Sequence, residues 1–397
     1  MILPSFDIGS PALANATLRI SLDALVAGAR LTGVIAVRDV TGTHADVVLS
    51  LVKSAPGSTR VEGVKDSDTA LVLLDAGAPV VVVAADILKS DAGFAGLPKD
   101  RVWAEIVVRP GEDLKKHAEP VRDLAGGFHF VFTEEPDADA VAGFAADLPP
   151  HRVSVAGAIT KLAQIAALDR AGAAARVGAP LLDGTLSLAE AFAAPLRTDR
   201  TDGLWSTVIV DEQGVAIGFA FSDIESLTAA LTQGVGAYHS RSRKSLWIKG
   251  ATSGATQRLL GIAPDCDRDA LRFTVRQTEP GFCHEKTWSC WGATGGLPAL
   301  ARLLESRAKD APAGSYTHRL LNDPTLLASK LREEAGELIE ASARNDRKEV
   351  AAEAADVIYF TLVHLAKHGV SLAEVERILD ARHYKVTRRK GDAKPGK

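Results

Sequence analysis

Two groups of potential metal ligands lie close together in the second half of the sequence. They are the aspartates Asp265, Asp267 and Asp269, and all three cysteines of the chain, Cys266, Cys283 and Cys290. Carboxylate oxygens suit Mg²⁺, whereas thiolates suit Zn²⁺. The residue types therefore predict two metal sites, one of each kind.

The segment that follows the aspartates predicts how the two groups are separated. Residues 270–275 alternate apolar and polar side chains and are rich in β-formers, so the acidic group is expected on or beside a strand. Alternate strand residues face opposite sides, which would place the aspartates on one side and Cys266 on the other. The thiolate partners of Cys266 would then be Cys283 and Cys290 of a second subunit, and a homodimer is predicted.

Three thiolates would leave a fourth zinc position open for water, the pattern of catalytic zinc. The alternatives are a structural zinc knot, or an acidic loop with incidental cysteines.

A basic segment precedes the metal ligands. Its candidate substrate-binding residues are Arg241, Ser242, Arg243, Trp247, Lys249, Thr252, Ser253 and Gly254. Arginine suits phosphate, an indole can stack on a purine, and hydroxyls beside a glycine suit a tight anion-binding turn. A solvated basic hairpin is the alternative, but the neighbouring metal ligands favour phosphate binding.

The same segment carries a family resemblance. Residues 238–257 read YHSRSRKSLWIKGATSGATQ and, with DCDRD and the later CH and C, resemble phosphoribosyl-AMP cyclohydrolase of histidine biosynthesis over Asp202 to Gly292. The resemblance implies opening of the purine ring between N1 and C6 by water bound to zinc. His284 would transfer protons or orient the site, and Mg²⁺ would organise phosphate or ribose. Ala255 replaces the family's usual asparagine, and Glu285-Lys286 replaces Thr-Gly.

The C-terminal region has helical periodicity. Residues 297–309, 324–344, 348–368 and 372–386 are expected to form helices of a bundle. Two acidic motifs, EExxE and ExxD, place carboxylates on helix faces: Glu333, Glu334, Glu337, Glu353 and Asp356. Two such faces opposed across a bundle would hold Mg²⁺ on a polyphosphate, although either motif alone is more often a solvated face.

This acidic spacing and the preceding SYTHRLL resemble phosphoribosyl-ATP pyrophosphohydrolase over Ser315 to Lys385. The resemblance implies metal-assisted attack of water on the polyphosphate, with release of pyrophosphate. Phosphoribosyl-AMP would remain, which is the substrate of the cyclohydrolase step. The two resemblances together predict a bifunctional hydrolase.

The first 195 residues alternate apolar strands with alanine-rich helices, which predicts an α/β domain with a partial or degenerate βα barrel. Expected strands are 33–37, 79–83, 102–108, 128–132 and 152–155, and expected helices include 67–75, 112–124 and 161–171. Val153 to Phe192 resembles a late unit of the phosphate-binding (β/α)8 isomerase of the same pathway. The segment is short for eight units, and Asp7 has no evident carboxylate partner, so a non-catalytic scaffold or dimer surface is predicted.

The expected domains are 1–195, an α+β domain at 202–292, an all-α domain at 297–387, and a disordered basic tail at 388–397. The net charge of −4 argues against nucleic-acid or membrane partners, and no apolar run reaches membrane-spanning length. The N-terminus lacks a signal-peptide pattern, so a cytoplasmic enzyme is expected.

Parts of the sequence also fit three other functions. The first is a nucleoside triphosphate pyrophosphohydrolase with a structural zinc module. The second is a non-enzymatic assembly protein, which the complete sets of metal ligands argue against. The third is a zinc nucleobase deaminase, whose combined His-x-Glu and Cys-x-x-Cys signature is absent.

Overall fold

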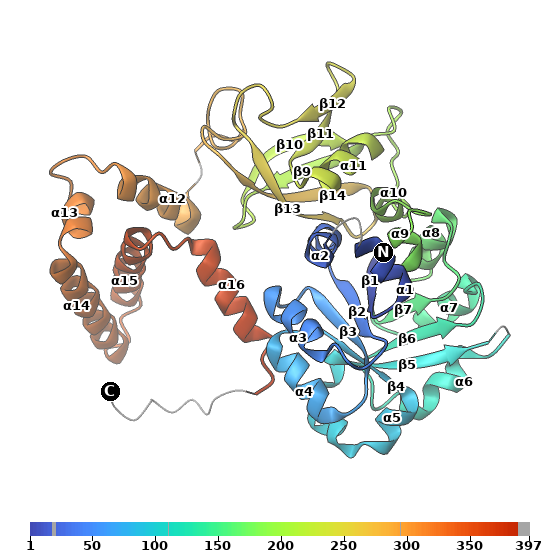
Figure 1. Ribbon diagram of the computed structural model, residues 1–397. Helices are drawn as coiled ribbons and strands as arrows, with labels where there is room; N and C mark the ends of the chain where they lie inside the picture. Colours follow the sequence, from blue (N-terminus) through green and yellow to red (C-terminus); the bar gives the residue numbers. More distant parts are fainter. Residues whose placement is uncertain (18–20, 110, 294, 388–397) are drawn as a thin grey trace. The chain divides into compact units, whose positions relative to one another are not determined.

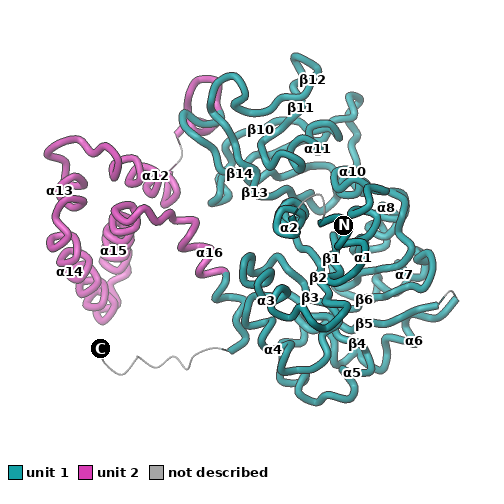
Figure 2. The backbone as a smooth tube through the Cα atoms, in the orientation of Figure 1, with its two compact units in different colours: residues 1–282, 381–397 teal, residues 283–380 magenta. Residues whose placement is uncertain are grey.

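The computed structural model describes residues 1–17, 21–109, 111–293 and 295–387 (Figure 1). The chain forms two compact units (Figure 2). The first contains residues 1–282 together with the C-terminal segment from 381, and the second contains residues 283–380. The predicted disordered tail, 388–397, lies outside the described residues.

The N-terminal part of the first unit is a closed barrel of eight parallel strands in sequential order. The strands are β1 (Ile2–Ile8), β2 (Ile35–Asp39), β3 (Thr59–Val64), β4 (Val81–Ala84), β5 (Val102–Val108), β6 (Gly127–Phe132), β7 (Val153–Ala156) and β8 (Ala173–Val177). Pairing of β1 with β8 closes the barrel, with Leu3 opposite Arg176. The isomerase-like βα architecture predicted for this region is therefore present.

Helices follow most of the barrel strands. They are α1 (Pro11–Thr17), α2 (Leu22–Arg30), α3 (Ala45–Ser54), α4 (Ser67–Ala76), α5 (Ala85–Ser90), α6 (Leu114–Ala118), α7 (Ala138–Ala145), α8 (Leu162–Arg170), α9 (Ala179–Leu182) and α10 (Leu188–Ala193), with 3-10 turns at 92–96, 99–101 and 119–121. Local signals set their ends. Asp66 caps α4 by accepting the N–H of Thr69, and the left-handed Gly77 ends it.

The expectation of a partial barrel was wrong. Eight βα units fit into fewer than 195 residues because several of the connecting helices are very short. Helices α5, α6 and α9 contain only 6, 5 and 4 residues. Eight units with helices of ordinary size would need about 250 residues.

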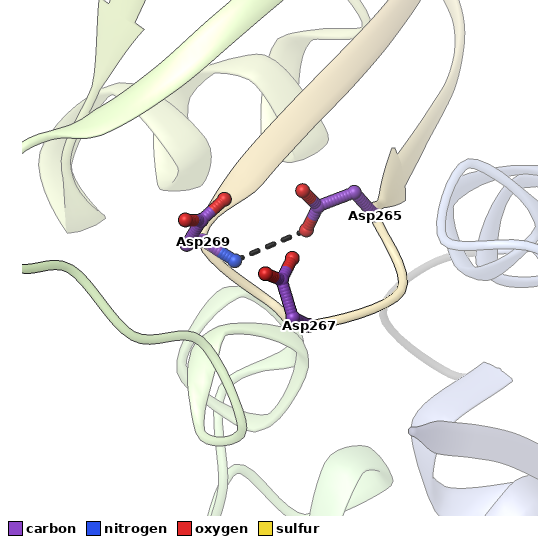
Figure 3. A group of neighbouring side chains, drawn as sticks. All are labelled: Asp265, Asp267 and Asp269. Atoms are coloured by element: carbon purple, nitrogen blue, oxygen red, sulfur yellow. Dashed lines mark hydrogen bonds between the residues drawn. The ribbon is translucent and has the colours of Figure 1, made fainter.

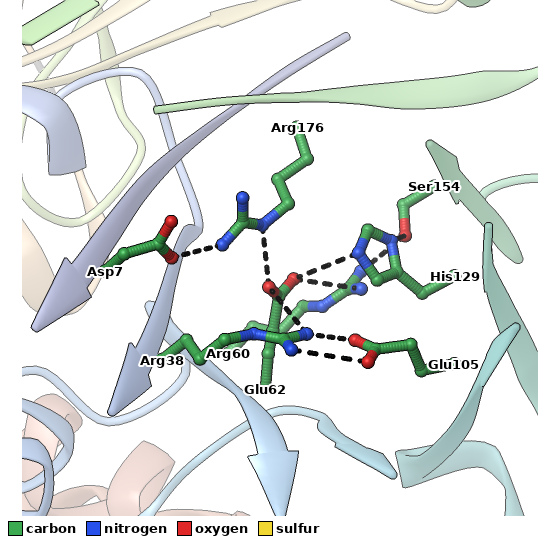
Figure 4. A network of polar contacts seen from close by, with 8 residues as sticks. All are labelled: Asp7, Arg38, Arg60, Glu62, Glu105, His129, Ser154 and Arg176. Carbon is green, nitrogen blue, oxygen red and sulfur yellow. Dashed lines mark hydrogen bonds and ion pairs between the residues drawn. The ribbon is translucent and has the colours of Figure 1, made fainter. Parts of the chain in front are cut away.

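A network of charged side chains fills part of the barrel interior (Figure 4). At its centre Glu62 is fully buried and contacts Arg176 Nε at 2.7 Å and Arg60 Nη2 at 3.2 Å. Arg176 also pairs with Asp7, and Arg38 pairs with Glu105. Ser154 accepts from Arg60 and contacts His129, completing the network of eight residues.

The second part of the first unit is a mixed six-stranded sheet in the order β12-β11-β10-β9-β14-β13. Its elements are β9 (Trp205–Val210), β10 (Ala216–Ser222), α11 (Ile224–Gln233), β11 (Ala237–Ser240), β12 (Ser245–Ile248), β13 (Gln257–Pro264) and β14 (Ala270–Gln277). Strands β9 and β14 are parallel and the other neighbours are antiparallel. Strands β9 and β10 form a hairpin around residues 211–214, and the strand predicted after Asp269 is confirmed.

Residues 381–387 belong to the first unit. The N–H groups of Val386 and Thr387 each donate to Asp75 Oδ1 of the barrel at 2.8 Å. This contact anchors the end of the described chain on α4.

The second unit is helical, as predicted. It contains α12 (Gly296–Lys309), α13 (Tyr316–Asn322), α14 (Pro324–Ala343), α15 (Arg347–Lys367) and most of α16 (Leu372–His383). Asp323 caps α14, and Pro324 occupies its first turn. Four of these helices share a core, formed by Ala301, Leu304, Leu320, Leu327, Phe360, Leu362, Val363 and Ala366. Among the described helices, none has the length and apolarity needed to span a bilayer.

Candidate metal and nucleotide sites

The three aspartates converge in the loop between β13 and β14 (Figure 3). One carboxylate oxygen from each lies within 4.8 Å of the others. Asp265 Oδ1 accepts the N–H groups of Asp269 at 3.0 Å and Ala270 at 3.2 Å, which closes the loop. The convergence therefore arises from a tight hairpin loop, and the expected alternation along a strand was the wrong reason for it.

The aspartate cluster concentrates negative charge. The charge of Asp267 raises the pKa of Asp269. Partial burial opposes ionisation of Asp265, yet the N–H of Ala270 and further hydrogen bonds lower the pKa of that carboxyl. Mutual repulsion of this kind is relieved by a cation, so the cluster has the donor chemistry and spacing for Mg²⁺.

The three cysteines form no disulfide in the described part of the chain, and they belong to both units. Cys266 is exposed in the aspartate loop, whereas Cys283 and Cys290 belong to the second unit. The backbone N–H of Glu285 and then the Thr287 side chain lower the pKa of Cys283. This favours the thiolate, which is the form that binds zinc.

His284, the predicted proton-transfer residue, is exposed beside Cys283. Its Nδ1 atom lies 3.9 Å from Cys283 Sγ. The neighbouring Trp288 ring packs under the Arg302 guanidinium at 4.7 Å. An exposed imidazole next to a thiolate is placed to serve either as a proton carrier or as a group that orients the thiolate.

The turn between β11 and β12 presents the first predicted substrate-binding residues. Arg241, Ser242 and Arg243 are all exposed or half-exposed there. The Arg241 guanidinium lies 4.2 Å from the Phe221 ring centre, and that of Arg200 lies 4.5 Å from it. Arg200 is already paired with Asp202, through Nε at 2.9 Å and Nη2 at 2.6 Å, so Arg241 is the guanidinium of this pair that suits binding of an anion.

Trp247 is half-buried and Lys249 is buried, and both pack within the sheet region. Trp247 packs against Tyr238 and Phe282, with ring centres 5.7 and 6.2 Å apart. Lys249 is only 6% exposed, and its Nζ donates to the carbonyls of Ala255 at 3.1 Å and Gly281 at 3.4 Å. These contacts give both side chains a structural role, while purine stacking on Trp247 stays a prediction.

The loop after β12 carries the predicted hydroxyl turn. Thr252, Ser253 and Gly254 are exposed, and Gly254 has φ +74°. Gly250 has φ +84°, and a Cβ there would lie 2.5 Å from the Ala255 carbonyl. The two glycines therefore set the shape of this turn, and Gly250 does so through close backbone approach.

The sequence interpretation missed one polar pair in the sheet. His239 Nδ1 lies 2.6 Å from Asp223 Oδ2, and Asp223 also caps α11. Pairing of Phe221 with His239 between β10 and β11 brings them together. No local sequence signal marks the contact, because it depends on strand register.

The helical unit brings together three of its five predicted ligands. Oxygens of Glu334, Glu337 and Glu353, from α14 and α15, lie within 4.8 Å of one another. Glu334 is buried and Glu353 is half-buried. Burial and then the charge of Glu337 raise the pKa of Glu353, to which Asp356 also contributes.

Glu333, another of the five predicted ligands, pairs with a cation of its own helix. Lys330 Nζ lies 2.9 Å from both Glu333 and Glu334. Lys330 thus bridges Glu333 to the edge of the carboxylate cluster.

Comparison with known proteins assigns both regions. Residues 219–292 match the family model of phosphoribosyl-AMP cyclohydrolase, and residues 297–383 match that of phosphoribosyl-ATP pyrophosphohydrolase. The histidine biosynthesis bifunctional protein HisIE of Parasynechococcus marenigrum is 37% identical over 213 residues, which cover 49% of this chain and 96% of that protein. The chain belongs to this family of histidine biosynthesis proteins.

Fungal relatives are also similar. The bifunctional protein his7 of Schizosaccharomyces pombe is 49% identical over 209 residues, or 53% of this chain and 49% of that protein. The trifunctional protein of Komagataella pastoris is 52% identical over 209 residues, or 53% of this chain and 24% of its own length. The chain thus spans about a quarter to a half of the length of these fungal relatives. Both resemblances inferred from the sequence motifs are confirmed.

Proposed function

We propose that this chain catalyses two consecutive hydrolytic steps of histidine biosynthesis. The helical unit removes pyrophosphate from phosphoribosyl-ATP, and the β-sheet region opens the adenine ring of the resulting phosphoribosyl-AMP between N1 and C6. The observation that carries the proposal is that each family segment contains a convergent carboxylate cluster, at 265–269 and at 334–353.

In the pyrophosphohydrolase step, Glu334, Glu337 and Glu353 would hold Mg²⁺ against the polyphosphate. Magnesium supplies charge neutralisation for the leaving pyrophosphate. The raised pKa of Glu353 supports this role, because a carboxylate crowded by like charges gains most from a bound cation. Glu333 and Asp356, at the edge of the cluster, would adjust its charge.

In the ring-opening step, Cys266, Cys283 and Cys290 would hold zinc, which supplies an acidified water for attack at C6. The lowered pKa of Cys283 supports thiolate ligation. His284 would carry the proton toward the ring nitrogen, and Asp265, Asp267 and Asp269 would hold the Mg²⁺ that organises the phosphate or ribose. A cytoplasmic, reducing environment would keep these thiols free for the metal.

The phosphate groups of the substrate require cations near the metals. Arg241, stacked on Phe221, offers an exposed guanidinium, while the neighbouring Arg200 is held by Asp202. Ser242 and Arg243 belong to the same turn, and the 252–254 turn lies beyond the other end of β12. We propose Arg241 and these turns as the phosphate-binding side of the ring-opening site.

The barrel is proposed to be non-catalytic. Asp7, its only candidate acid or base from the sequence, is engaged by Arg176, which itself contacts the buried Glu62. The Asp7 carboxylate is thus already engaged within the charge network of the barrel.

Two single substitutions test the assignment of steps to regions. Cys283→Ala should abolish zinc binding and ring opening while pyrophosphate release continues. Glu337→Gln should abolish pyrophosphate release while supplied phosphoribosyl-AMP is still opened. Ring opening by Cys283→Ala, or unchanged pyrophosphate release by Glu337→Gln, would contradict the corresponding assignment.

Sharing of zinc ligands across a homodimer has its own test. The Cys266→Ala and Cys283→Ala chains would each be inactive in ring opening. A mixed dimer would contain one intact site, formed by Cys266 of one chain with Cys283 and Cys290 of the other. Mixing the two variants after mild dissociation should therefore restore ring opening to a fraction of the wild-type rate. If mixed and verified heterodimers stay inactive, the ligands are not shared in this way.

A further inference from the structure

The aspartate loop is tied to the barrel by a single arginine within it. Arg268 Nε lies 3.1 Å from Asp169 Oδ2, and its Nη2 lies 3.0 Å from Asp169 Oδ1. Asp169 belongs to α8 of the barrel. The two side chains are 11% and 8% exposed, so this two-pronged ion pair is shielded from most solvent.

Arg268 also shapes the loop itself. Its Nη1 donates to the Asp265 carbonyl at 2.8 Å, and its own carbonyl accepts the N–H of Arg197 at 2.8 Å. The guanidinium therefore connects the start of the loop to the barrel helix. The loop is thus held both through the side chain of Arg268 and through its backbone carbonyl.

The backbone of Arg268 is in an unfavourable conformation. Its φ is +71°, in the left-handed region that costs free energy for any residue with a Cβ. A glycine would adopt this φ without that cost. Because an arginine stands here, its side-chain contacts must offset the free-energy cost of the left-handed backbone. The contact that joins the loop to the barrel is the Asp169 pair.

The ion pair with Asp169 also holds the Arg268 guanidinium, which lies in the sequence between two proposed metal ligands. Arg268 follows Asp267 and precedes Asp269 in the loop. A guanidinium released from Asp169 would be free to pair with these carboxylates and to compete with a divalent cation. While Asp169 engages two of its nitrogens, the carboxylates remain grouped with one another.

We propose that the N-terminal barrel positions the cation-binding loop of the ring-opening site, with Asp169 acting through Arg268 as a positioning residue. The barrel, for which no reaction is proposed, thereby gains a role in the neighbouring site. The inference rests on the proposed function of the loop, and its first test uses neither metal nor substrate.

The first measurement is amide hydrogen exchange of the full-length, metal-free protein. The N–H groups of Asp269 and Ala270 are bonded to Asp265 Oδ1 and should be protected in the wild type. Asp169→Asn should speed exchange of the 265–270 peptide about fivefold or more. Asp147→Asn is the matched control, because it removes a carboxylate that pairs with Lys115 on the barrel surface far along the chain from the loop.

A double-mutant cycle separates positioning from general damage to the barrel. Arg268→Gly removes the arginine and fits the left-handed backbone, and the Met1 amine contact of Asp169 is kept. In the Arg268→Gly chain, Asp169→Asn should therefore cause no further change in the exchange rate of the 265–270 peptide. The proposal would be overturned if Asp169→Asn sped exchange of the 265–270 peptide equally with and without Arg268. It would also be overturned if Asp169→Asn did not change that exchange in the wild-type background.

The second measurement is Mn²⁺ binding, followed by electron paramagnetic resonance in a Glu337→Gln background that weakens the helical cluster. Asp169→Asn should weaken the loop's Mn²⁺ affinity about fivefold. In the chain with Glu337 intact, the same substitution should leave pyrophosphate release unchanged. If loop exchange changes but no Mn²⁺ binds there, the cation assignment of the loop fails while the positioning of the loop by the barrel stands.

Discussion

Replacing Glu62 with glutamine tests whether the charge network is required for the barrel to be stable. Glu62 is fully buried, and its carboxylate lies between Arg176 Nε at 2.7 Å and Arg60 Nη2 at 3.2 Å. His129 is neutral at pH 7, because burial lowers its pKa to about 3. Arg60 therefore depends on Glu62 for its partner charge, whereas Arg176 also pairs with Asp7 and Arg38 with Glu105.

The expected cost follows from the burial. Glu62→Gln keeps the side-chain volume but leaves Arg60, only 4% exposed, without its partner charge. Loss of one member of a buried pair costs about 3–5 kcal/mol. With a urea m-value of about 2 kcal/mol/M, the unfolding midpoint should fall by about 2 M. Glu105→Gln is the control: Glu105 and its partner Arg38 are both partly exposed, so a loss of about 1 kcal/mol is expected.

The pH dependence of the same variant gives an independent check. Burial opposes ionisation of Glu62, but Arg176 and the other cations outweigh it and hold its pKa well below the usual range. A carboxyl with a lowered folded-state pKa stabilises the protein above its unfolded-state pKa, about 4.3, and this stability is lost as the pH falls. The gap between wild type and Glu62→Gln should therefore narrow below about pH 4.

Urea unfolding followed by circular dichroism at pH 7 and at pH 3.5 measures both effects. A change of less than about 1 kcal/mol at pH 7, the size expected of an exposed pair, would refute the reasoning that the network compensates buried charge.

The remaining predictions concern the sheet and the metals. Gly254→Ala should cost about 1 kcal/mol, because only its left-handed φ opposes a side chain, whereas Gly250→Ala should cost about 3 kcal/mol in total because its Cβ would also strike the Ala255 backbone. Similar unfolding midpoints for the two variants would contradict the crowding seen at Gly250. Removal of zinc with a chelator, followed by readdition of Mg²⁺ alone, should abolish ring opening and spare pyrophosphate release; loss of both activities would show that zinc also serves the helical unit.

Several barrel strands are predictable from the sequence and three are not. Strand β5 matches its prediction at both ends, because it is a buried apolar run. Strand β3 carries Arg60 and Glu62 into the barrel interior, so its polarity hides a buried strand. Strand β8 begins with three alanines, which favour a helix, and β1 contains a proline. Tertiary contacts override these local preferences.

The candidate sites divide in the same way. The three aspartates converge as predicted, although a tight loop brings them together and not alternation along a strand. The grouping of Glu334, Glu337 and Glu353 follows from the predicted opposition of two acidic helix faces. Burial of Lys249 depends on the Gly281 carbonyl, which only the folded sheet brings near. The Asp169 to Arg268 contact joins residues 99 positions apart, and no local pattern marks it.

The most direct test of the central claim is one time course with the purified full-length chain. Phosphoribosyl-ATP is supplied with Mg²⁺ and Zn²⁺, and pyrophosphate release is followed together with the absorbance of the ring-opened product. We expect pyrophosphate to appear first and the ring-opened product to follow after a lag, since the first product is the second substrate. Pyrophosphate without any ring opening, even when phosphoribosyl-AMP is supplied directly, would contradict the two-step function.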